Sequence, residues 1–129
     1  MAAVELITAL ALLQFFFFGV LVGRARGRYG VAAPATTGNE VFERYFRVQM
    51  NTLELLVMFL PALWMALSFV DSRWVALLGV IYLIGRLLYL QGYVAAPGKR
   101  GLGYGLSAMP VIILVLIDLV GAVLRLLRG

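Results

Sequence analysis

The chain contains no cysteine and no histidine. These two absences exclude disulfide bonds, a thiolate nucleophile supplied by the protein and an imidazole base. They also remove the side chains that most often bind zinc and copper, and we expect no metal site. Any polar chemistry must come from Arg, Lys, Tyr, Glu, Asp, Asn and Gln. A reaction at sulfur therefore requires a substrate or cofactor that brings its own thiol.

Charged residues are also scarce. They make up 13% of the 129 residues, whereas 64% are hydrophobic, and the mean hydropathy is +1.01. A soluble domain would be about half apolar and about a quarter charged. The apolar residues gather in segments of roughly the 20 residues that a helix needs to cross a bilayer. We therefore expect one integral membrane domain over residues 1–129. The net charge of +5 is spread along the flanks of these segments, so we expect no nucleic-acid partner.

The hydrophobic pattern predicts an all-α fold, an up-down-up-down four-helix bundle with helices at about 4–23, 38–70, 74–94 and 104–127. The first segment lacks a charged leader and a cleavage pattern, which favours a retained helix over a signal peptide. A buried Gln14 in it is expected to make an interhelical hydrogen bond.

The segments between the predicted helices carry turn and capping signals. Three arginines, several glycines and Pro34 predict a loop over residues 24–40. Thr37 and Glu40 have the spacing of a capping box, which places the start of the second helix near Gly38. Asp71 or Ser72 can cap the third helix. Residues 95–103 form a second, glycine-rich loop.

Basic residues predict the orientation in the membrane. The first and third loops carry five of them: Arg24, Arg26, Arg28, Lys99 and Arg100. The positive-inside rule therefore places these loops in the cytoplasm and both termini outside. The short Ala/Leu/Arg-rich chain has no targeting extension, which favours a bacterial inner membrane.

Two polar stripes run along the predicted helices at the cytoplasmic end. Residues at steps of three, four and three fall within roughly 80° of arc on one face of the second helix: Arg44, Arg47, Asn51 and Glu54. The third helix carries a matching face with Arg86, Tyr89 and Tyr93. Because both faces lie at the same depth, we expect them to meet in one polar site.

The stripes have a purely structural alternative. Glu54 could pair with Arg47 or Arg86, the tyrosines could belong to an interfacial belt, and Arg44 could pair with neighbouring glutamates. Asp118 could make only a helix–helix hydrogen bond. Arginines outnumber acids at this end, however, and an intramembrane charge costs at least about 2.5–3.5 kcal/mol. The surplus guanidinium groups therefore predict an anionic ligand with carboxylates, which bind arginine in bidentate fashion.

These residues resemble a known family. The run Gly38–Arg44, the second-helix positions that follow it and a third-helix motif are similar to the MAPEG family (membrane-associated proteins in eicosanoid and glutathione metabolism). The matching positions are Arg47, Gln49, Asn51, Glu54, Arg86, Tyr89, Gln91, Gly92, Tyr93 and Arg100. The pattern is nearest to the branch of leukotriene C4 synthase and microsomal glutathione transferase 2. Its likeness to this chain spans about residues 23–100.

The resemblance implies a homotrimer that binds glutathione between subunits at the cytoplasmic end. It implies that Arg100 is catalytic and holds the glutathione sulfur as thiolate. The glutathione-binding residues that it implies are Arg26, Arg47, Gln49, Asn51, Glu54, Tyr89 and Tyr93. The expected activity is that of a glutathione transferase or peroxidase acting on a lipophilic electrophile from the bilayer. The alternatives are a non-catalytic lipid-binding or scaffold protein and a small channel or transporter, the last disfavoured because inverted repeats are absent.

Overall fold

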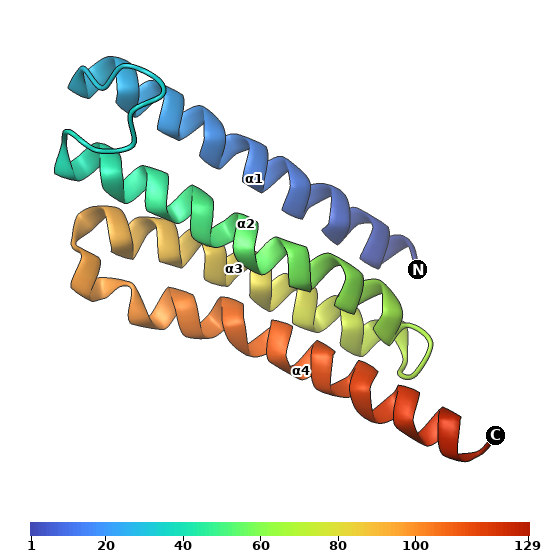
Figure 1. Cartoon of the computed structure of the whole chain (residues 1–129). Helices are drawn as coiled ribbons and strands as arrows, with labels where there is room; N and C mark the ends of the chain where they lie inside the picture. The colour runs from blue at the N-terminus through green and yellow to red at the C-terminus, as the bar shows by residue number, and fades with distance from the viewer.

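Four long helices account for most of the chain in the computed structural model, which describes all 129 residues. The helices are α1 (Ala2–Tyr29), α2 (Glu40–Ala66), α3 (Ser72–Ala95) and α4 (Gly101–Leu127), with a 3-10 turn, η1 (Pro97–Lys99), before α4 (Figure 1). There is no strand, and each long helix is long and apolar enough to cross a membrane. The predicted all-helical membrane protein is confirmed at this level.

The first helix is longer than predicted. We expected it to end at Gly23, but α1 continues to Tyr29 and carries Arg24, Arg26 and Arg28 as helical residues. Arginine is a good helix former and a single glycine is tolerated, so Gly27 between these arginines does not break the helix. The helix ends at Gly30, whose φ of 68° is left-handed and whose N–H donates to the Arg26 carbonyl. Only residues 30–39 form the connection.

The second helix begins later and ends earlier than predicted. Its cap is Asn39 and not Thr37, because the Asn39 Oδ1 accepts from the N–H groups of Val41 and Phe42 at 2.9 and 3.0 Å. These two bonds satisfy backbone N–H groups that a helix start leaves without a partner. The helix ends at Ala66 instead of Val70, and the next residues form turns.

The turn before α3 contains the only ion pair of the chain. The Asp71 Oδ1 accepts from the Arg73 N–H at 2.8 Å, so the predicted cap is confirmed. It also lies 3.2 Å from the Arg73 Nε. These contacts lower the pKa of the exposed Asp71 carboxyl. After α3 and η1, the fourth helix begins at Gly101, three residues earlier than the predicted start at Tyr104.

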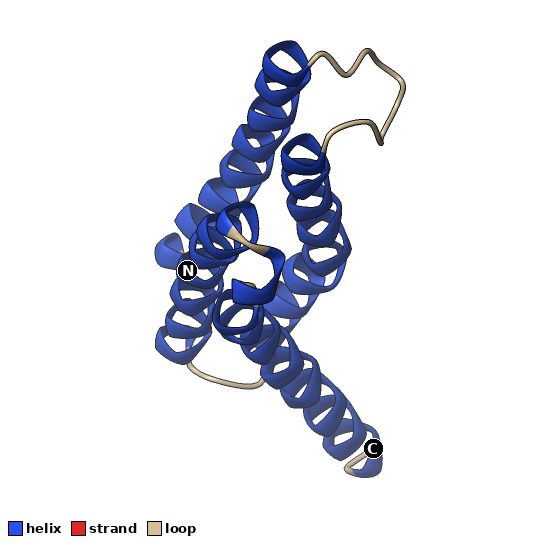
Figure 2. Ribbon diagram, turned by 90° about the vertical axis from the view of Figure 1, so that its left-hand side faces the viewer, coloured by secondary structure: helices blue, strands red, loops and turns tan.

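Helices α3 and α4 meet backbone to backbone at glycines. A Cβ built on Gly103 would overlap the backbone of Tyr89, and one on Gly85 would lie 2.6 Å from the Leu106 carbonyl carbon. Small residues allow this close approach between helices in membranes. Helix α1 contacts α2 and α3 (Figures 1 and 2). The glycines therefore fix the spacing of the two helices that carry the third-helix polar face and Arg100.

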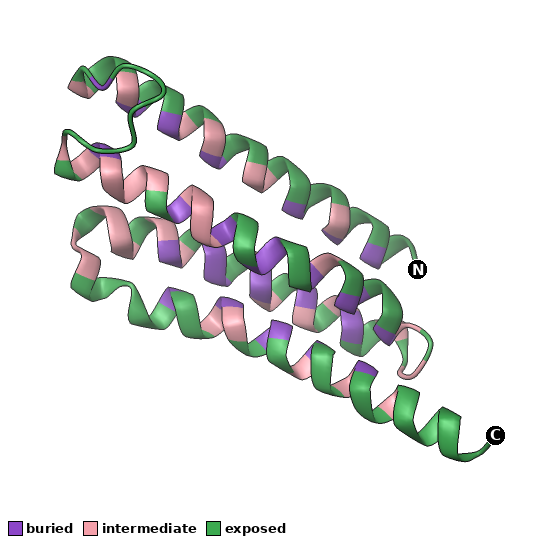
Figure 3. Ribbon diagram, viewed as in Figure 1, coloured by how far each residue is buried: buried purple, intermediate pink, exposed green.

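The apolar core lies between the helices, and the outside of the molecule is apolar too. Phe59 and Tyr82 stack in the core with ring centroids 3.8 Å apart. Buried residues line the inward sides of the helices (Figure 3), while large side chains such as Phe16 and Ile112 are exposed. The Gln14 Nε2 donates to the Leu83 carbonyl at 3.0 Å, which confirms the predicted interhelical hydrogen bond. An apolar exterior of this kind suits a lipid surround.

Candidate functional site

A polar cavity of about 370 Å³ lies between α2, α3 and the start of α4. Six side chains line it: Arg47, Asn51, Tyr89, Tyr93, Arg100 and Tyr104. Five of these are among the eight site residues predicted from the sequence. Two members of each polar stripe therefore meet in this cavity, and Arg44, Glu54 and Arg86 do not line it.

Tyr104 is the lining residue that sequence reasoning missed. The sequence pattern predicts it as the first residue of an apolar helix, whereas it lies in the first turn of α4, four residues after Arg100. Its ring centroid is 6.1 Å from that of Tyr89. The spacing of four from Arg100 is the signal that could have identified it, because residues four apart share a helix face.

Local structure positions the remaining side chains. Arg47 and Asn51 are one turn apart on α2, and Tyr89 and Tyr93 are one turn apart on α3 with ring centroids 5.5 Å apart. Arg100 lies at the bend between η1 and α4, where its Nη1 donates to the Pro97 carbonyl at 2.9 Å. Its guanidinium carbon is 5.9 Å from the Tyr93 ring centroid.

Arg86 lies behind this cavity without lining it. Its side chain is fully buried, and its Nη1 donates to the Asn51 Oδ1 at 2.8 Å and to the Thr52 Oγ1 at 3.1 Å. The guanidinium carbon is 4.4 Å from the Tyr89 ring centroid. The structural alternative paired Arg86 or Arg47 with Glu54, but neither ion pair is present.

Three predicted site residues lie outside the cavity. Glu54 is exposed on α2, one turn beyond Asn51. Gln49 packs against α1, where its Nε2 lies 3.1 Å from the place of a Cβ on Gly19. Arg26 donates to the Ala35 carbonyl at 2.6 Å, and its guanidinium lies over the Phe42 ring. Arg26 and Gln49 thus occupy the contact between α1 and α2, while the cavity belongs to α2, α3 and α4.

A second polar cavity of about 300 Å³ adjoins the first. Its lining shares Arg47 and Tyr93 with the first cavity and adds Glu40, Glu43, Arg44 and Pro97. The structural ion pair considered for Arg44 is absent, because its Nη1 donates to the carbonyls of Val94 and Ala95 at 3.1 and 3.4 Å. Arg44 therefore ties α2 to the end of α3 through neutral acceptors.

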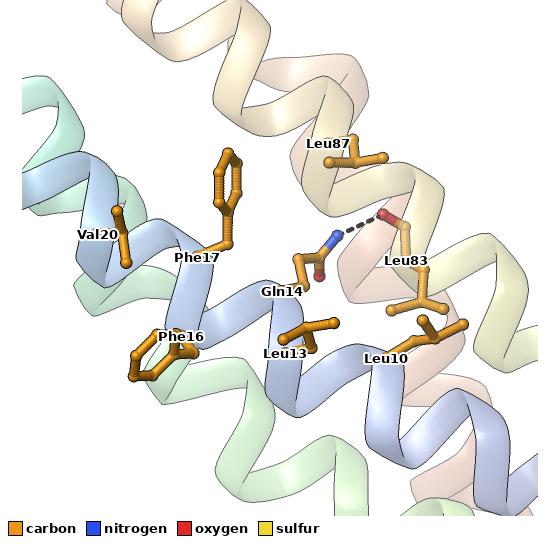
Figure 4. Close-up of a pocket in the computed structure, with 8 residues that line it drawn as sticks. All are labelled: Leu10, Leu13, Gln14, Phe16, Phe17, Val20, Leu83 and Leu87. Carbon is orange, nitrogen blue, oxygen red and sulfur yellow. Dashed lines mark hydrogen bonds between the residues drawn. The ribbon is translucent and has the colours of Figure 1, made fainter.

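A separate, apolar groove of about 590 Å³ lies between α1 and α3 (Figure 4). Gln14 is its one polar side chain, and Figure 4 shows its amide nitrogen directed to the Leu83 carbonyl. The other lining residues are Leu10, Leu13, Phe16, Phe17, Val20, Leu83 and Leu87. The groove shares no residue with the polar cavity and offers no charge.

The polar cavity is suited to an anion. Its lining supplies two guanidinium groups, three phenols and one amide, and no carboxylate. Guanidinium groups stabilise the ionised form of a nearby acid and bind carboxylates in bidentate fashion. The chain contains no group of three acidic side chains placed to hold a metal ion. The arrangement can therefore bind carboxylates and stabilise a second negative charge, such as a thiolate.

Comparison with known proteins extends these findings. The model of the MAPEG family matches residues 4–120. An uncharacterized protein of Synechocystis is 50% identical over 122 residues, which cover 95% of this chain and 86% of the relative. Human microsomal glutathione S-transferase 2 is 41% identical over 95% of this chain and 79% of its own length. Rat leukotriene C4 synthase is 35% identical over 99% of this chain and 85% of its own length.

Proposed function

Because this chain belongs to the MAPEG family, we propose that it is a membrane-bound glutathione transferase that joins the glutathione thiolate to lipophilic electrophiles. The observation that carries the proposal is the acid-free cavity with Arg47 and Arg100, in a chain that has no thiol of its own. Relatives named as glutathione S-transferases support the choice of thiol.

Arg100 would be the catalytic residue. A free thiol has a pKa near 8.5 and is mostly protonated at about pH 7. Each unit of pKa depression requires about 1.4 kcal/mol of selective thiolate stabilisation. A guanidinium group supplies this stabilisation and never loses its own proton. Arg100 is exposed at the η1–α4 bend, where it can reach an incoming thiol.

The other lining residues would bind the tripeptide. Arg47 would hold a carboxylate, with Asn51, Tyr89 and Tyr93 as further hydrogen-bonding groups. Glu54 is one turn from Asn51 and has no partner within the chain, so it would suit the ligand's ammonium group. A cavity of about 370 Å³ lies within the size range of small-molecule sites.

Arg26 and Gln49 would complete the site from a neighbouring subunit. They lie at the α1–α2 contact and not in the cavity of their own chain. A cyclic homotrimer can place this contact against the next subunit's cavity, because a heterologous interface joins two different surfaces of the same chain. The helices would cross the membrane in up-down-up-down order.

The polar cavity would face the cytoplasm, and the electrophile would come from the bilayer. Residues 30–39 and η1 lie at the same end of the molecule (Figure 1), and the basic residues there would make it the cytoplasmic end of a bacterial inner membrane. Large apolar side chains cover the outside of the helices. Holding thiolate and electrophile together would supply most of the rate enhancement.

The first test measures glutathione binding by calorimetry and conjugation to chlorodinitrobenzene, using purified protein in detergent. We expect saturable binding and glutathione-dependent turnover. Binding without turnover would exclude the proposed transferase activity and indicate a protein that only binds glutathione. If neither is observed, the proposal is wrong and the scaffold alternative is favoured.

The shared site predicts complementation between two inactive variants. Arg26→Ala and Arg100→Ala each damage a different half of the site, so each homotrimer should have low activity. When equal amounts of the two variants are co-expressed and assemble at random, each half of a site comes from a subunit intact in that half with a probability of about one half. About a quarter of the sites then have two intact halves. We expect activity near that fraction of the unsubstituted protein. Activity no higher than the average of the two variants would mean that both residues serve the same chain's site.

A further inference from the structure

Arg86 is a buried cation that the proposed mechanism does not use. Its side chain is fully buried, and no carboxylate lies within ion-pair distance, since the chain's one ion pair joins Arg73 to Asp71. Its Nε and Nη2 have no hydrogen-bond partner. An unpaired charge inside a membrane span is costly and marks a functional role by default.

The contacts of Arg86 reach two walls of the polar cavity. Its Nη1 donates to the Asn51 Oδ1 at 2.8 Å, and its guanidinium carbon lies 4.4 Å from the Tyr89 ring centroid. Asn51 lies on α2 and Tyr89 on α3, and both line the cavity. Arg86 therefore holds both walls from behind, where an occupant of the cavity does not touch it.

Neighbouring hydrogen bonds hold the guanidinium group in place. The Nη1 of Arg86 also donates to the Thr52 Oγ1 at 3.1 Å. The Thr52 hydroxyl in turn donates to the Val48 carbonyl one turn earlier on α2, at 2.7 Å. The hydroxyl proton is thus used, and the hydroxyl oxygen can only accept from Arg86. This chain of bonds anchors Arg86 to the backbone of α2.

The bond to Asn51 determines which half of its amide faces the cavity. A guanidinium group has donors and no acceptor, so it must bind the carbonyl oxygen and not the NH₂ group. The Asn51 Nδ2 has no partner within the chain and is not a buried atom. Its N–H groups are therefore free for a ligand. Beside Arg47 and Arg100, an amide held in this way offers only donors and selects an acceptor, such as a carboxylate or a peptide carbonyl.

On the basis of the proposed function, we propose that Arg86 is a positioning residue for glutathione binding. It holds Asn51 with its N–H groups toward the cavity and packs against the Tyr89 ring. Without it the Asn51 amide can flip and present its oxygen, which repels a carboxylate. Arg86 thereby helps to set the preference of the cavity for a carboxylate-bearing thiol.

A double-mutant cycle tests this role. The variants are Arg86→Met, Asn51→Ala and the combination, each measured for glutathione Kd and KM and for kcat with chlorodinitrobenzene. We expect Arg86→Met to raise Kd and KM about tenfold or more. Its kcat at saturating glutathione should stay within about threefold, because Arg100 lies at the η1–α4 bend, whereas Arg86 contacts Asn51, Thr52 and Tyr89. The combined variant should lose less affinity than the product of the two single losses, since both act through one amide.

Two further variants separate positioning from folding. Arg86→Lys keeps the charge and some donor capacity, and we expect it to recover part of the affinity. Tyr82→Phe is the matched control one turn earlier on α3, because Tyr82 is equally buried and its hydroxyl has no partner. It should leave Kd unchanged. If Arg86→Met does not assemble, the same cycle is measured with Arg86→Lys.

The outcomes distinguish this inference from the proposed function. Glutathione binding by the unsubstituted protein, together with independent losses in the cycle, would overturn the role of Arg86 alone. The same holds if Arg86→Met lowers only the amount of active protein and leaves KM unchanged. If the unsubstituted protein binds no glutathione, both the proposed function and this inference are wrong.

Discussion

Replacing Arg100 with alanine is expected to lower kcat roughly 20-fold at about pH 7 while changing glutathione Kd by less than about threefold. If Arg100 lowers the pKa of the bound thiol from about 8.5 to about 6.5, the thiolate fraction at pH 7 falls from about three quarters to about 3% when Arg100 is removed. Arg47 and Asn51 remain in the cavity to hold the tripeptide. The loss therefore falls on the reacting sulfur and not on binding.

The difference in rate between the unsubstituted protein and Arg100→Ala should decrease as pH rises. A lowered thiol pKa means that the unsubstituted protein keeps the thiolate down to lower pH, and the variant regains it only as pH rises toward 9. The two rates should therefore approach each other at alkaline pH. Lys99→Ala is the control, since Lys99 is an exposed neighbouring cation outside the cavity lining, and its rate should be unchanged. Equal rates for Arg100→Ala and the unsubstituted protein at about pH 7 would contradict the catalytic role proposed for Arg100.

Replacing Gly103 with alanine is expected both to destabilise the protein and to weaken glutathione binding. The new Cβ would overlap the backbone nitrogen and Cα of Tyr89. A backbone cannot rotate aside as a side chain can, so α3 and α4 must separate. Overpacking of this kind costs about 1–3 kcal/mol or more. We expect Tm in detergent to fall by about 5–10 °C. Glutathione affinity should fall too, because Tyr89 and Tyr104 line the cavity from the two separated helices.

Gly105 provides the matched control for this substitution. It lies two residues later on the same helix, and a Cβ built on it meets nothing within 4 Å. Alanine is the better helix former by about 1 kcal/mol, so Gly105→Ala should leave Tm unchanged or raise it. Similar Tm values for the two variants would show that the α3–α4 contact does not depend on close backbone approach.

Features that depend on local periodicity could be predicted from the sequence. The four apolar segments and the polar face of each helix follow from spacing along one helix, and the Asp71 cap follows from its residue type at a helix start. The convergence of Arg47 and Asn51 with Tyr89 and Tyr93 follows from the equal depth of the two faces at one end of the bundle. The end of α1 could not be predicted, because arginines that continue a helix look the same in sequence as arginines in a loop. The left-handed residue that stops the helix is Gly30, one of several glycines in that stretch.

Features that depend on how the helices are rotated relative to one another could not be predicted from the sequence. The structural alternative paired Arg86 with Glu54, but the packing of α3 against α2 places Arg86 on Asn51 and Thr52 and leaves Glu54 exposed. The same rotation places Gln49 against α1 instead of in the cavity. Sequence spacing gives the face of each helix, while only packing decides which neighbour that face meets.

The single ion pair between Asp71 and Arg73 has a consequence for the response of the protein to ionic strength. It joins two residues of one exposed turn, so no helix is held to another by opposite charges. At physiological concentration, salt screens interactions between exposed charges over about 8 Å. Because no ion pair joins two helices, this screening does not weaken the contacts between the helices. Added sodium chloride should thus leave the packing of the helices intact and reduce the attraction of an anion to the arginines of the cavity. A salt titration of this protein reports on occupancy of the cavity and not on the integrity of the fold.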